Sequence, residues 1–394
     1  MNNLLNFSKI HLQESEPTEA FIKDPILKTI NFSKEQFWLY EIVNTFEFQR
    51  LAKIKQLSLT INNFPSCTHT RLTHSLGVYE LCNRFTQHFI ASGDLDKNKD
   101  QIAINIALAT SLLHDIGHGP LSHALERALP HFHHEKMAVL LLNSPETKIN
   151  LLLRKKAKED NLDEFFYIQE IEKVFNKTSE HKWIIDLISS DIDIDRLDFL
   201  IRDSYYSGVQ YGSTVDVSLL IKWSLLRKDA NGDLRFFFQL KAKYMIGNFL
   251  LTRYHMYEEL YRNRASLVYE DLLCKTFSYI KENQEYFKNL EPFKKISFLF
   301  SELDNWNIMS FLSLTDELFL SLFNELTNMD FKMLKFFRAL FLGFSNKEDI
   351  STYLSKNPLE KDTSLGGEKI TISFWDTKQE SIVESTINIS DFYN

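Results

Sequence analysis

A chain of 394 residues with a net charge of −8 is long enough to bury a large core and too acidic to favour long nucleic acid as its main partner. Hydrophobic residues make up 44% of the sequence and the three cysteines lack a Cys-x-x-Cys spacing, which argues against both a disulfide framework and a cysteine zinc site. Because the chain shows neither a secretory signal nor an apolar run of the ~18 residues that span a bilayer, we expect a cytoplasmic protein without membrane contact.

Helical periodicity and a low content of glycine and proline predict a mainly α fold. The first helix is expected over about 33–57, opened by a capping box of Ser33 and Gln36. A second helix is expected over 73–93, where the final glycine suits a helix C-terminus. A third helix, over about 100–116, has almost no polar face, so we expect it to be central and buried.

The glycines and proline at 117–120 end this third helix. Two short helices are expected after it, over 121–129 and 134–143. The mixed charges of 154–182 predict a solvated excursion, and apolar periodicity then indicates a helix over 183–202.

Helices are expected to continue to about residue 288, and helical periodicity persists to Phe344 before a polar linker that ends at Gly366 and Gly367. The segments KITISFW and STINIS alternate apolar and polar residues, which predicts a small C-terminal β-hairpin.

The segment LLHDIGHGPLSH, residues 112–123, places polar side chains at the end of the buried helix. His114 and His118 are four residues apart and share a face if the helix continues. Burying imidazole and carboxylate groups without partners costs several kcal/mol, so the cluster needs hydrogen bonds or a compensating charge. A hydrogen-bonded core histidine is the common explanation for a single His-Asp pair, and a divalent metal ion is the other.

Two distant segments favour the metal. His74 lies in HTRLTHSLGVYEL, and Asp195 lies three residues before Asp198 in SSDIDIDRLDFLIRDS. Imidazole and carboxylate ligands together suit Mn, Fe, Ni, Zn or Mg with open water positions. We therefore predict one divalent metal ion as the cofactor.

An ordered series of motifs across roughly residues 20–270 resembles the HD-domain phosphohydrolases, and within them the deoxynucleoside triphosphate (dNTP) triphosphohydrolases, which include an animal enzyme with a SAM domain. The motifs are IKDPI, FQRLAKIKQL, THTRLTHSLGVYEL, LLHDIGHGPLSH, HEK and DIDIDRLDFLIRDSYYSGV. The resemblance implies an HD-domain helical core over 1–285. The remainder, 286–394, is expected to be a C-terminal helical accessory region that ends in the small β-hairpin.

The resemblance also implies site residues. It assigns metal ligation to His74, His114, Asp115 and Asp195. It places His118 and His123 near the substrate phosphates and pairs His134 with a carboxylate, Glu126, where the animal enzyme has aspartate. Phosphate contacts are implied for Arg71, Arg196 and Arg264, and deoxyribose contacts for Gln56, Leu57 and Asp203. The alternative for several of these is structural, such as a surface charge for Glu126 or a helix-start cation for Arg71.

The expected reaction is hydrolysis of a dNTP to a deoxynucleoside and inorganic triphosphate. A divalent metal lowers the pKa of water to give a nucleophile for the α-phosphorus, while a protonated His134 held by Glu126 supplies a proton to the departing 5′-oxygen. His118 is included in the same catalytic group. Two alternatives stay open: an HD phosphohydrolase acting on nucleoside monophosphates or on cyclic or short oligonucleotides, and a nucleotide-binding regulator with little turnover.

Three positions depart from the animal enzyme. Phe199 replaces a tyrosine beside the substrate, so a hydroxyl contact is missing. Asn44 and Ala52 replace the acidic residue and the arginine of its nucleotide-activated control site, so we expect no GTP requirement. Many relatives are oligomers, and a homo-oligomer is expected here.

Overall fold

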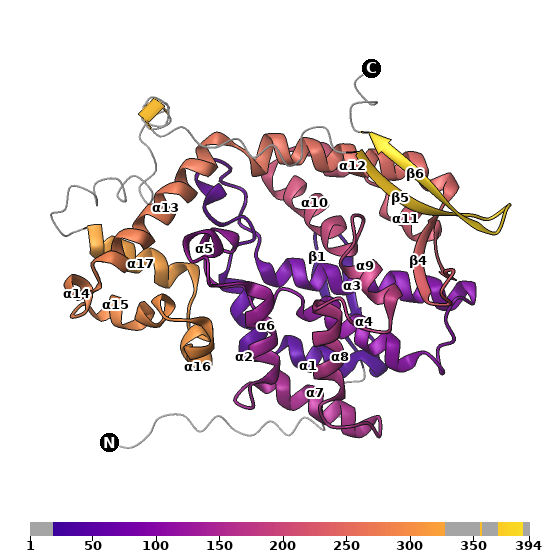
Figure 1. Ribbon diagram of the computed structural model, residues 1–394, viewed down its shortest axis with the longest axis horizontal. Helices are drawn as coiled ribbons and strands as arrows, with labels where there is room; N and C mark the ends of the chain where they lie inside the picture. The colour runs from indigo at the N-terminus through magenta and orange to yellow at the C-terminus, as the bar shows by residue number, and fades with distance from the viewer. Residues whose placement is uncertain (1–18, 328–354, 357–368, 389–394) are drawn as a thin grey trace, which may run out of the picture.

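The structure is a computed structural model that describes residues 19–327, 355–356 and 369–388. It is mainly helical, as predicted (Figure 1). The first helices are α1 (Phe37–Val43), α2 (Phe46–Gln49), α3 (Arg71–Ser92), α4 (Gln101–Leu113), α5 (His123–Ala128), α6 (His134–Asn143), α7 (Lys148–Glu159), α8 (Phe166–Phe175) and α9 (Lys182–Ile188). They are followed by α10 (Ile194–Ser207), α11 (Val217–Lys222), α12 (Lys243–Met256), α13 (Arg264–Glu282), α14 (Gln284–Phe287), α15 (Glu291–Ile296), α16 (Ile308–Leu312) and α17 (Asp316–Thr327).

The centre of the molecule is built on α3 and α4, which pack against each other. Every residue of α4 from Ala103 to Leu113 is buried, which confirms the expectation of a central helix without a polar face. Helix α3 ends at Gly93, whose φ of 79° is the left-handed conformation that glycine adopts readily. Packing in the centre of the molecule thus fixes the beginning of α3 and the end of α4, and side chains from these two ends form the site described below.

Two predicted helices are each divided into shorter elements. The capping box of Ser33 and Gln36 is present, but it opens only a 3₁₀ turn before α1. The chain bends again where the Thr45 hydroxyl caps α2, so 33–57 is not one helix. Likewise 183–202 divides into α9 and α10, because the Asp193 carboxylate accepts a hydrogen bond from the Arg196 backbone N–H and starts a new helix.

The prediction that 154–182 is a solvated excursion is wrong. The segment contains the second half of α7 and all of α8, and each helix buries one face. Ala157 of α7 and Tyr167 and Ile171 of α8 are fully buried, while charged residues such as Lys155, Lys158 and Glu159 are exposed. Because charged residues are so frequent in this segment, the narrow apolar stripe of each helix was not recognised in the sequence.

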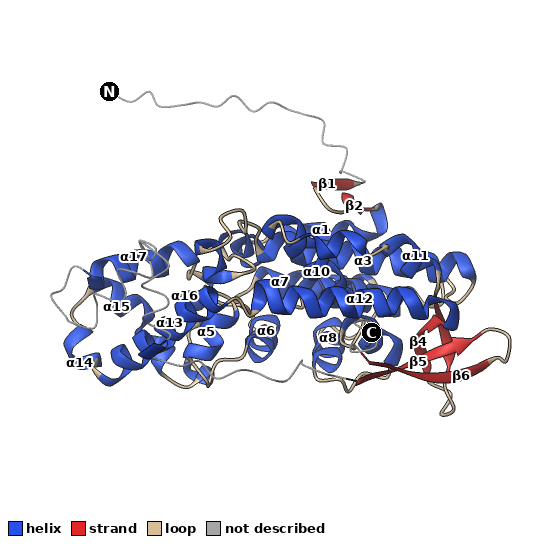
Figure 2. Cartoon of the chain, turned by 90° about the horizontal axis from the view of Figure 1, so that it is seen from above, coloured by secondary structure: helices blue, strands red, loops and turns tan. Residues whose placement is uncertain are grey.

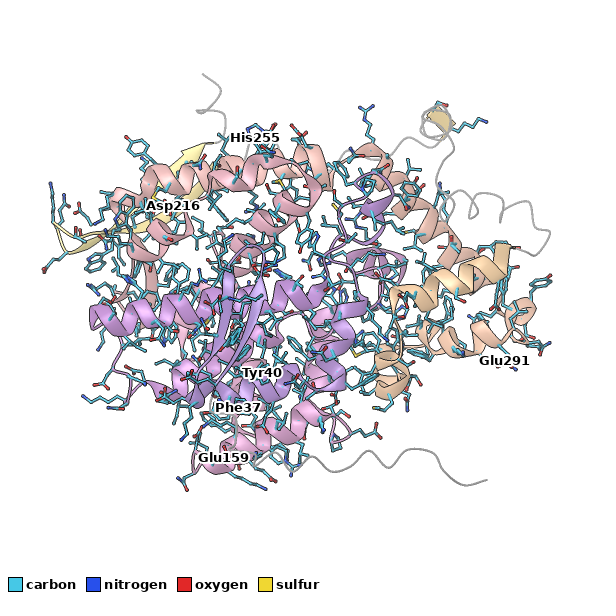
Figure 3. All side chains as sticks on the ribbon, turned by 180° about the vertical axis from the view of Figure 1, so that it is seen from behind. Phe37, Tyr40, Glu159, Asp216, His255 and Glu291 are labelled. Atoms are coloured by element: carbon cyan, nitrogen blue, oxygen red, sulfur yellow. The ribbon has the colours of Figure 1, made fainter. Side chains whose placement is uncertain are left out.

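In the part of the chain that the structure describes, strands occur in two places. Strands β1 (Ala20–Asp24) and β2 (Lys28–Phe32) form an antiparallel hairpin that the sequence did not predict. Phe32 stacks on Tyr79 of α3 with ring centroids 4.5 Å apart, and it also contacts Tyr40 of α1. Figure 3 labels Tyr40 beside Phe37, on the part of α1 that lies against this hairpin. The hairpin thus covers the junction of α1 and α3.

A four-stranded sheet lies at one end of the molecule, away from α14–α17 (Figure 2). Its order is β3 (Ser224–Lys228), β4 (Leu234–Gln239), β5 (Lys369–Asp376) and β6 (Ser381–Asn388). The antiparallel β5–β6 pair confirms the predicted C-terminal hairpin. The expectation of uninterrupted helices to residue 288 is wrong at β3 and β4, which pair antiparallel and join β5 through a short parallel contact.

Helices α14–α17 group at the opposite end, where Figure 3 labels Glu291 of α15. The expected helical periodicity is matched by α15–α17 up to residue 327, while its continuation to Phe344 and the linker at Gly366 and Gly367 lie outside the described residues. Within the described part of the chain, no helix combines the length and the apolar character needed to cross a membrane.

Candidate active site

Two histidines face each other where α3 passes the end of α4. The Nε2 atoms of His74 and His114 are 3.2 Å apart. On the far side of each ring, Nδ1 of His74 lies 2.9 Å from Asp198 Oδ2, and Nδ1 of His114 lies 2.8 Å from the Ser111 carbonyl oxygen. Because those acceptors hold the Nδ1 protons, both Nε2 lone pairs are directed into the gap between the rings, the arrangement typical of metal-binding histidines.

Two carboxylates complete this group. Asp195 Oδ1 lies 2.9 Å from His74 Nε2 and 3.7 Å from His114 Nε2. Asp115 lies 3.5 Å from His114 Nε2 and 3.6 Å from His74 Nε2. His74, His114 and Asp115 have ligand atoms that all lie within 4.8 Å of one another, and Asp195, whose side chain is 33% exposed, adds a carboxylate beside both histidines. Two imidazole nitrogens and two carboxylates are a donor set that fits a divalent cation. The structure therefore brings together all four predicted metal ligands, a group called the HD cluster below.

The charges of the HD cluster favour a bound cation. Burial alone would raise the pKa of Asp115 and of Asp195. Arg71, His114 and His118 outweigh this effect at Asp115, and His114 and His74 outweigh it at Asp195, so both pKa values lie well below their usual range. Burial lowers the pKa of His74, and hydrogen bonds with Asp195 and Asp198 reverse this effect and raise the pKa to about 10. Both carboxylates are therefore ionised, and without a metal a proton on His74 compensates them.

A buried ionic chain supports His74 from behind. The Asp198 carboxylate accepts hydrogen bonds from Arg202 Nε at 2.7 Å and Nη2 at 2.9 Å, and Arg202 Nη1 donates to Asp24 at 2.8 Å. Gly77 on α3 makes the approach possible, since a Cβ there would lie 2.0 Å from Asp198 Oδ1. Sequence analysis assigned no role to Asp198 or Arg202, although the spacing of Asp195, Asp198 and Arg202 places them on one face of a helix.

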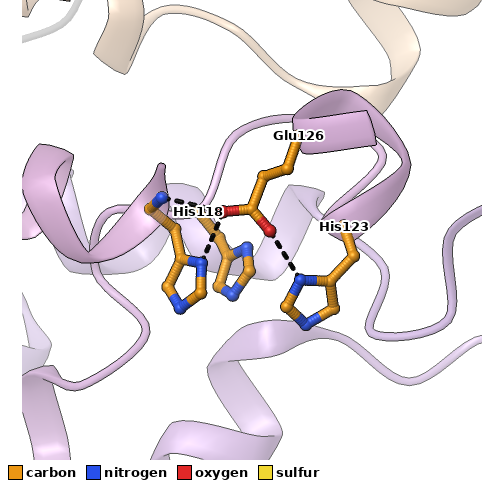
Figure 4. A group of neighbouring side chains, drawn as sticks. His118, His123 and Glu126 are labelled. Carbon is orange, nitrogen blue, oxygen red and sulfur yellow. Dashed lines mark hydrogen bonds and ion pairs between the residues drawn. The ribbon is translucent and has the colours of Figure 1, made fainter. Parts of the chain in front are cut away.

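A second cluster, the histidine cluster, comprises His118, His123, Glu126 and His134 (Figure 4). One Glu126 oxygen lies 2.6 Å from His123 Nδ1, and the other lies 2.6 Å from His134 Nδ1. That second oxygen also accepts the His134 backbone N–H at 2.8 Å. Burial would raise the pKa of Glu126, but these hydrogen bonds hold it well below its usual range. Glu126 is thus an ionised bridge that orients two imidazoles.

His118 links the two clusters. Its Nε2 lies 3.3 Å from Asp115 Oδ1, and its ring stacks on His134 with centroids 3.9 Å apart. Complete burial, followed by the nearby charges of Arg71 and His134, holds the pKa of His118 well below its usual range, so it is neutral. Gly117 permits the stack, because a Cβ there would lie 2.0 Å from the His134 carbonyl oxygen.

Arg71, the first residue of α3, connects the HD cluster to Ser122, the residue before His123. Its Nη1 donates to Asp115 Oδ2 at 2.6 Å, and its Nε donates to Ser122 Oγ at 3.0 Å. Ser122 in turn donates to the Lys55 carbonyl at 2.7 Å. The side chain is buried, so Arg71 is more than a surface cation at a helix start.

The remaining predicted residues differ in their surroundings. Gln56 is buried, and its Oε1 has no hydrogen-bond partner among the described residues, while Leu57 is half-buried. Arg196 is ion-paired with Asp193 and donates to the Ser190 carbonyl at 2.6 Å. Arg264 is exposed at the start of α13.

Each oxygen of Asp203 has one partner within the protein. Its carboxylate accepts from the Tyr261 hydroxyl at 2.7 Å and pairs with His69 Nε2 at 2.7 Å. The Tyr261 ring lies 6.0 Å from that of Phe199, centroid to centroid. A tyrosine hydroxyl is therefore present beside Phe199, supplied by a residue that sequence analysis did not identify.

Comparison with known proteins agrees with this geometry. A family model described as the HD domain matches residues 71–198, which contain both clusters. An uncharacterized protein of Mycoplasma genitalium is 38% identical over 325 residues, covering 76% of this chain and 73% of that protein. The chain belongs to the HD-domain phosphohydrolase family.

Two further relatives of this HD-domain protein carry functional names. A Dictyostelium discoideum protein named as a homolog of the deoxynucleoside triphosphate triphosphohydrolase SAMHD1 is 28% identical over 253 residues, covering 61% of this chain and 46% of that protein. The crystal structure of a phosphohydrolase from Bacteroides thetaiotaomicron has a TM-score of 0.72 and 25% identity, and the match covers 95% of this chain and 96% of that one.

Proposed function

We propose that the protein hydrolyses dNTPs to deoxynucleosides and inorganic triphosphate in a metal-dependent reaction. The observation that carries the proposal is the contact between the two clusters: His118 touches Asp115 of the HD cluster and stacks on His134 of the histidine cluster. A site for a divalent cation therefore lies next to a set of oriented imidazoles. A metal that activates water and an imidazole that transfers a proton can together hydrolyse a phosphate ester.

The residues divide the work as follows. His74, His114, Asp115 and Asp195 would hold the metal. A divalent metal bound there supplies Lewis acidity toward a phosphate oxygen and activation of water. Arg71 and His118 contact Asp115, and His123 contacts Glu126. We assign these three side chains to the phosphate oxygens, because guanidinium and imidazole N–H groups bind such oxygens well.

His134 is assigned as the general acid for the departing 5′-oxygen. Since its Nδ1 faces Glu126 at 2.6 Å, the proton that it can transfer is on Nε2. The ionised Glu126 carboxylate orients the ring through Nδ1, as a carboxylate behind a catalytic histidine does.

The sugar is assigned to the side of the site formed by Gln56, Leu57 and Asp203. The apolar Leu57 disfavours a 2′-hydroxyl, and the unpartnered Gln56 Oε1 is a buried acceptor suited to a substrate hydroxyl. The name of the Dictyostelium relative supports this substrate class. Because Asn44 and Ala52 replace the charged residues of the animal control site, we propose activity without GTP.

The test is chromatography of the products formed from each dNTP and each ribonucleotide, with Mn²⁺, Mg²⁺ or a chelator. Deoxynucleoside and intact triphosphate, formed only with metal and without GTP, are the expected products. Nucleoside monophosphate or orthophosphate would indicate one of the other phosphohydrolase activities. Calorimetric binding of dNTP without any product, from metal-loaded protein, would indicate a regulator.

A further inference from the structure

A carboxylate from the C-terminal helices reaches the loop that carries His118 and His123. Asp316, the first residue of α17, is 4% exposed. Its Oδ1 accepts the Leu121 backbone N–H at 2.8 Å, and its Oδ2 accepts the Lys55 backbone N–H at 2.9 Å. One side chain thus ties together two backbone segments that are separated from it by 195 and 261 residues in the sequence.

These two segments border the two halves of the proposed site. Lys55 directly precedes Gln56 and Leu57, which we assigned to the sugar. Leu121 lies between His118 and His123, which we assigned to the phosphates. The Ser122 hydroxyl adds a parallel connection, because it bonds both the Lys55 carbonyl and Arg71.

The loop has a conformation that needs external support. Leu121 and Ser122 have φ values of 61° and 52°, in the left-handed region that side chains other than glycine rarely adopt. Strained backbone of this kind persists only where surrounding contacts impose it, and it concentrates at functional sites. The hydrogen bond from Leu121 to Asp316 is a contact at the strained residue itself.

The neighbouring helix α16 supports the same loop. Arg50 is buried and donates to the carbonyl oxygens of Ile116 at 3.0 Å and His118 at 2.7 Å. Its guanidinium lies over the ring of Phe311 from α16, 4.8 Å from the centroid. Phe311 also packs against Gly119, where a Cβ would lie 3.4 Å from its ring.

Asp316 does not serve as the N-terminal cap of α17. The Thr315 hydroxyl accepts the Leu318 N–H at the start of α17, so another side chain caps that end. Both Asp316 oxygens instead accept backbone N–H groups from the core. Burial raises the pKa of the Asp316 carboxyl, and the hydrogen bonds from the Lys55 and Leu121 N–H groups act in the opposite direction.

We infer that Asp316 is a positioning residue that holds the sugar-side and phosphate-side segments of the active site in register. The C-terminal helices therefore contribute to catalysis although none of their residues contacts the proposed metal ligands through an identified hydrogen bond or ion pair within the described chain. The kinetic part of this inference rests on the proposed function, whereas the structural part does not.

The test compares Asp316→Ala and Asp316→Asn with Glu317→Gln in the full-length protein. Glu317 is the adjacent, exposed acidic residue in the same helical turn, so its substitution removes the same charge without touching the loop. Asp316→Asn keeps the side-chain volume and one acceptor oxygen. It therefore tests the loss of a hydrogen bond without leaving a cavity. Amide hydrogen exchange, metal content, kcat and KM are measured for each variant.

We expect faster exchange at the amides of both Lys55 and Leu121 in Asp316→Ala, and at one or both of them in Asp316→Asn, with unchanged metal content. We expect kcat for dNTP to fall roughly 10- to 100-fold in Asp316→Ala and less in Asp316→Asn, as small displacements of catalytic groups produce. Glu317→Gln should match wild type in every readout.

Wild-type exchange at both amides in Asp316→Asn, or equal kcat in the Asp316 and Glu317 variants, would overturn the inference. If wild-type protein hydrolyses no dNTP, the proposed function fails, and the exchange comparison alone still decides whether Asp316 positions the two segments.

Discussion

Substitution of Asp198 by asparagine tests the buried ionic chain behind His74. The carboxylate is fully buried and accepts three hydrogen bonds, two from Arg202 and one from His74 Nδ1. Asparagine has a single acceptor oxygen, and its amide group would face an N–H donor of Arg202 or His74. Arg202 would keep Asp24 as its one remaining ionic partner.

The expected cost follows from this burial. Breaking a buried ion pair on one side destabilises a protein by about 3–5 kcal/mol, because the remaining charge is left without compensation. The loss is large beside a typical unfolding free energy of about 5–15 kcal/mol. Since Asp198 also orients a proposed metal ligand, metal affinity should fall by about 10- to 100-fold.

The assay is urea unfolding of metal-free protein together with calorimetric metal titration, and Asp186→Asn is the matched control. Asp186 also forms a two-bond pair with an arginine, at 2.6 and 2.7 Å, but that partner, Arg235, is 39% exposed. Solvent screening limits such a pair to about 0–1 kcal/mol. Equal losses of stability in the two variants, or unchanged metal affinity in Asp198→Asn, would refute the reasoning.

Three further predictions concern other parts of the molecule. Gly117→Ala should cost about 1–3 kcal/mol in urea unfolding, because its Cβ would overlap the backbone of α6, and wild-type stability would contradict the packing described. Glu126→Gln should lower kcat about 10²- to 10⁴-fold with metal content unchanged, and a wild-type kcat would remove Glu126 from the reaction. Burial raises the pKa of Cys67 and of Cys82 to about 12, so neither thiol should react with an aromatic disulfide reagent before unfolding, and rapid labelling of native protein would disagree.

The local features of the site could be predicted from sequence. His114 and Asp115 follow a run of apolar residues, and this contrast between a buried helix and ionisable groups directed attention to them. The C-terminal hairpin was predicted from strict alternation of apolar and polar residues, a local signal of the same kind.

Contacts between distant segments could not be predicted in this way. Nothing near Asp316 in the sequence distinguishes it from Glu317, and its two partners are identified only when α17 packs against the core. The same holds for Asp24, which meets Arg202 across 178 residues. The prediction for 154–182 was wrong for a different reason. One buried apolar stripe per helix is enough for packing, but the charged residues of the solvent-facing side dominate the amino-acid composition of the segment.

The most direct test of the proposed reaction is to hydrolyse a dNTP in water enriched in heavy oxygen and to locate the label by mass spectrometry. Attack on the α-phosphorus, with His134 protonating the departing 5′-oxygen, places the label in inorganic triphosphate and leaves the deoxynucleoside unlabelled. Label in the deoxynucleoside, or in orthophosphate or a nucleotide product, would contradict the proposal that the HD cluster and the histidine cluster act together on the α-phosphorus.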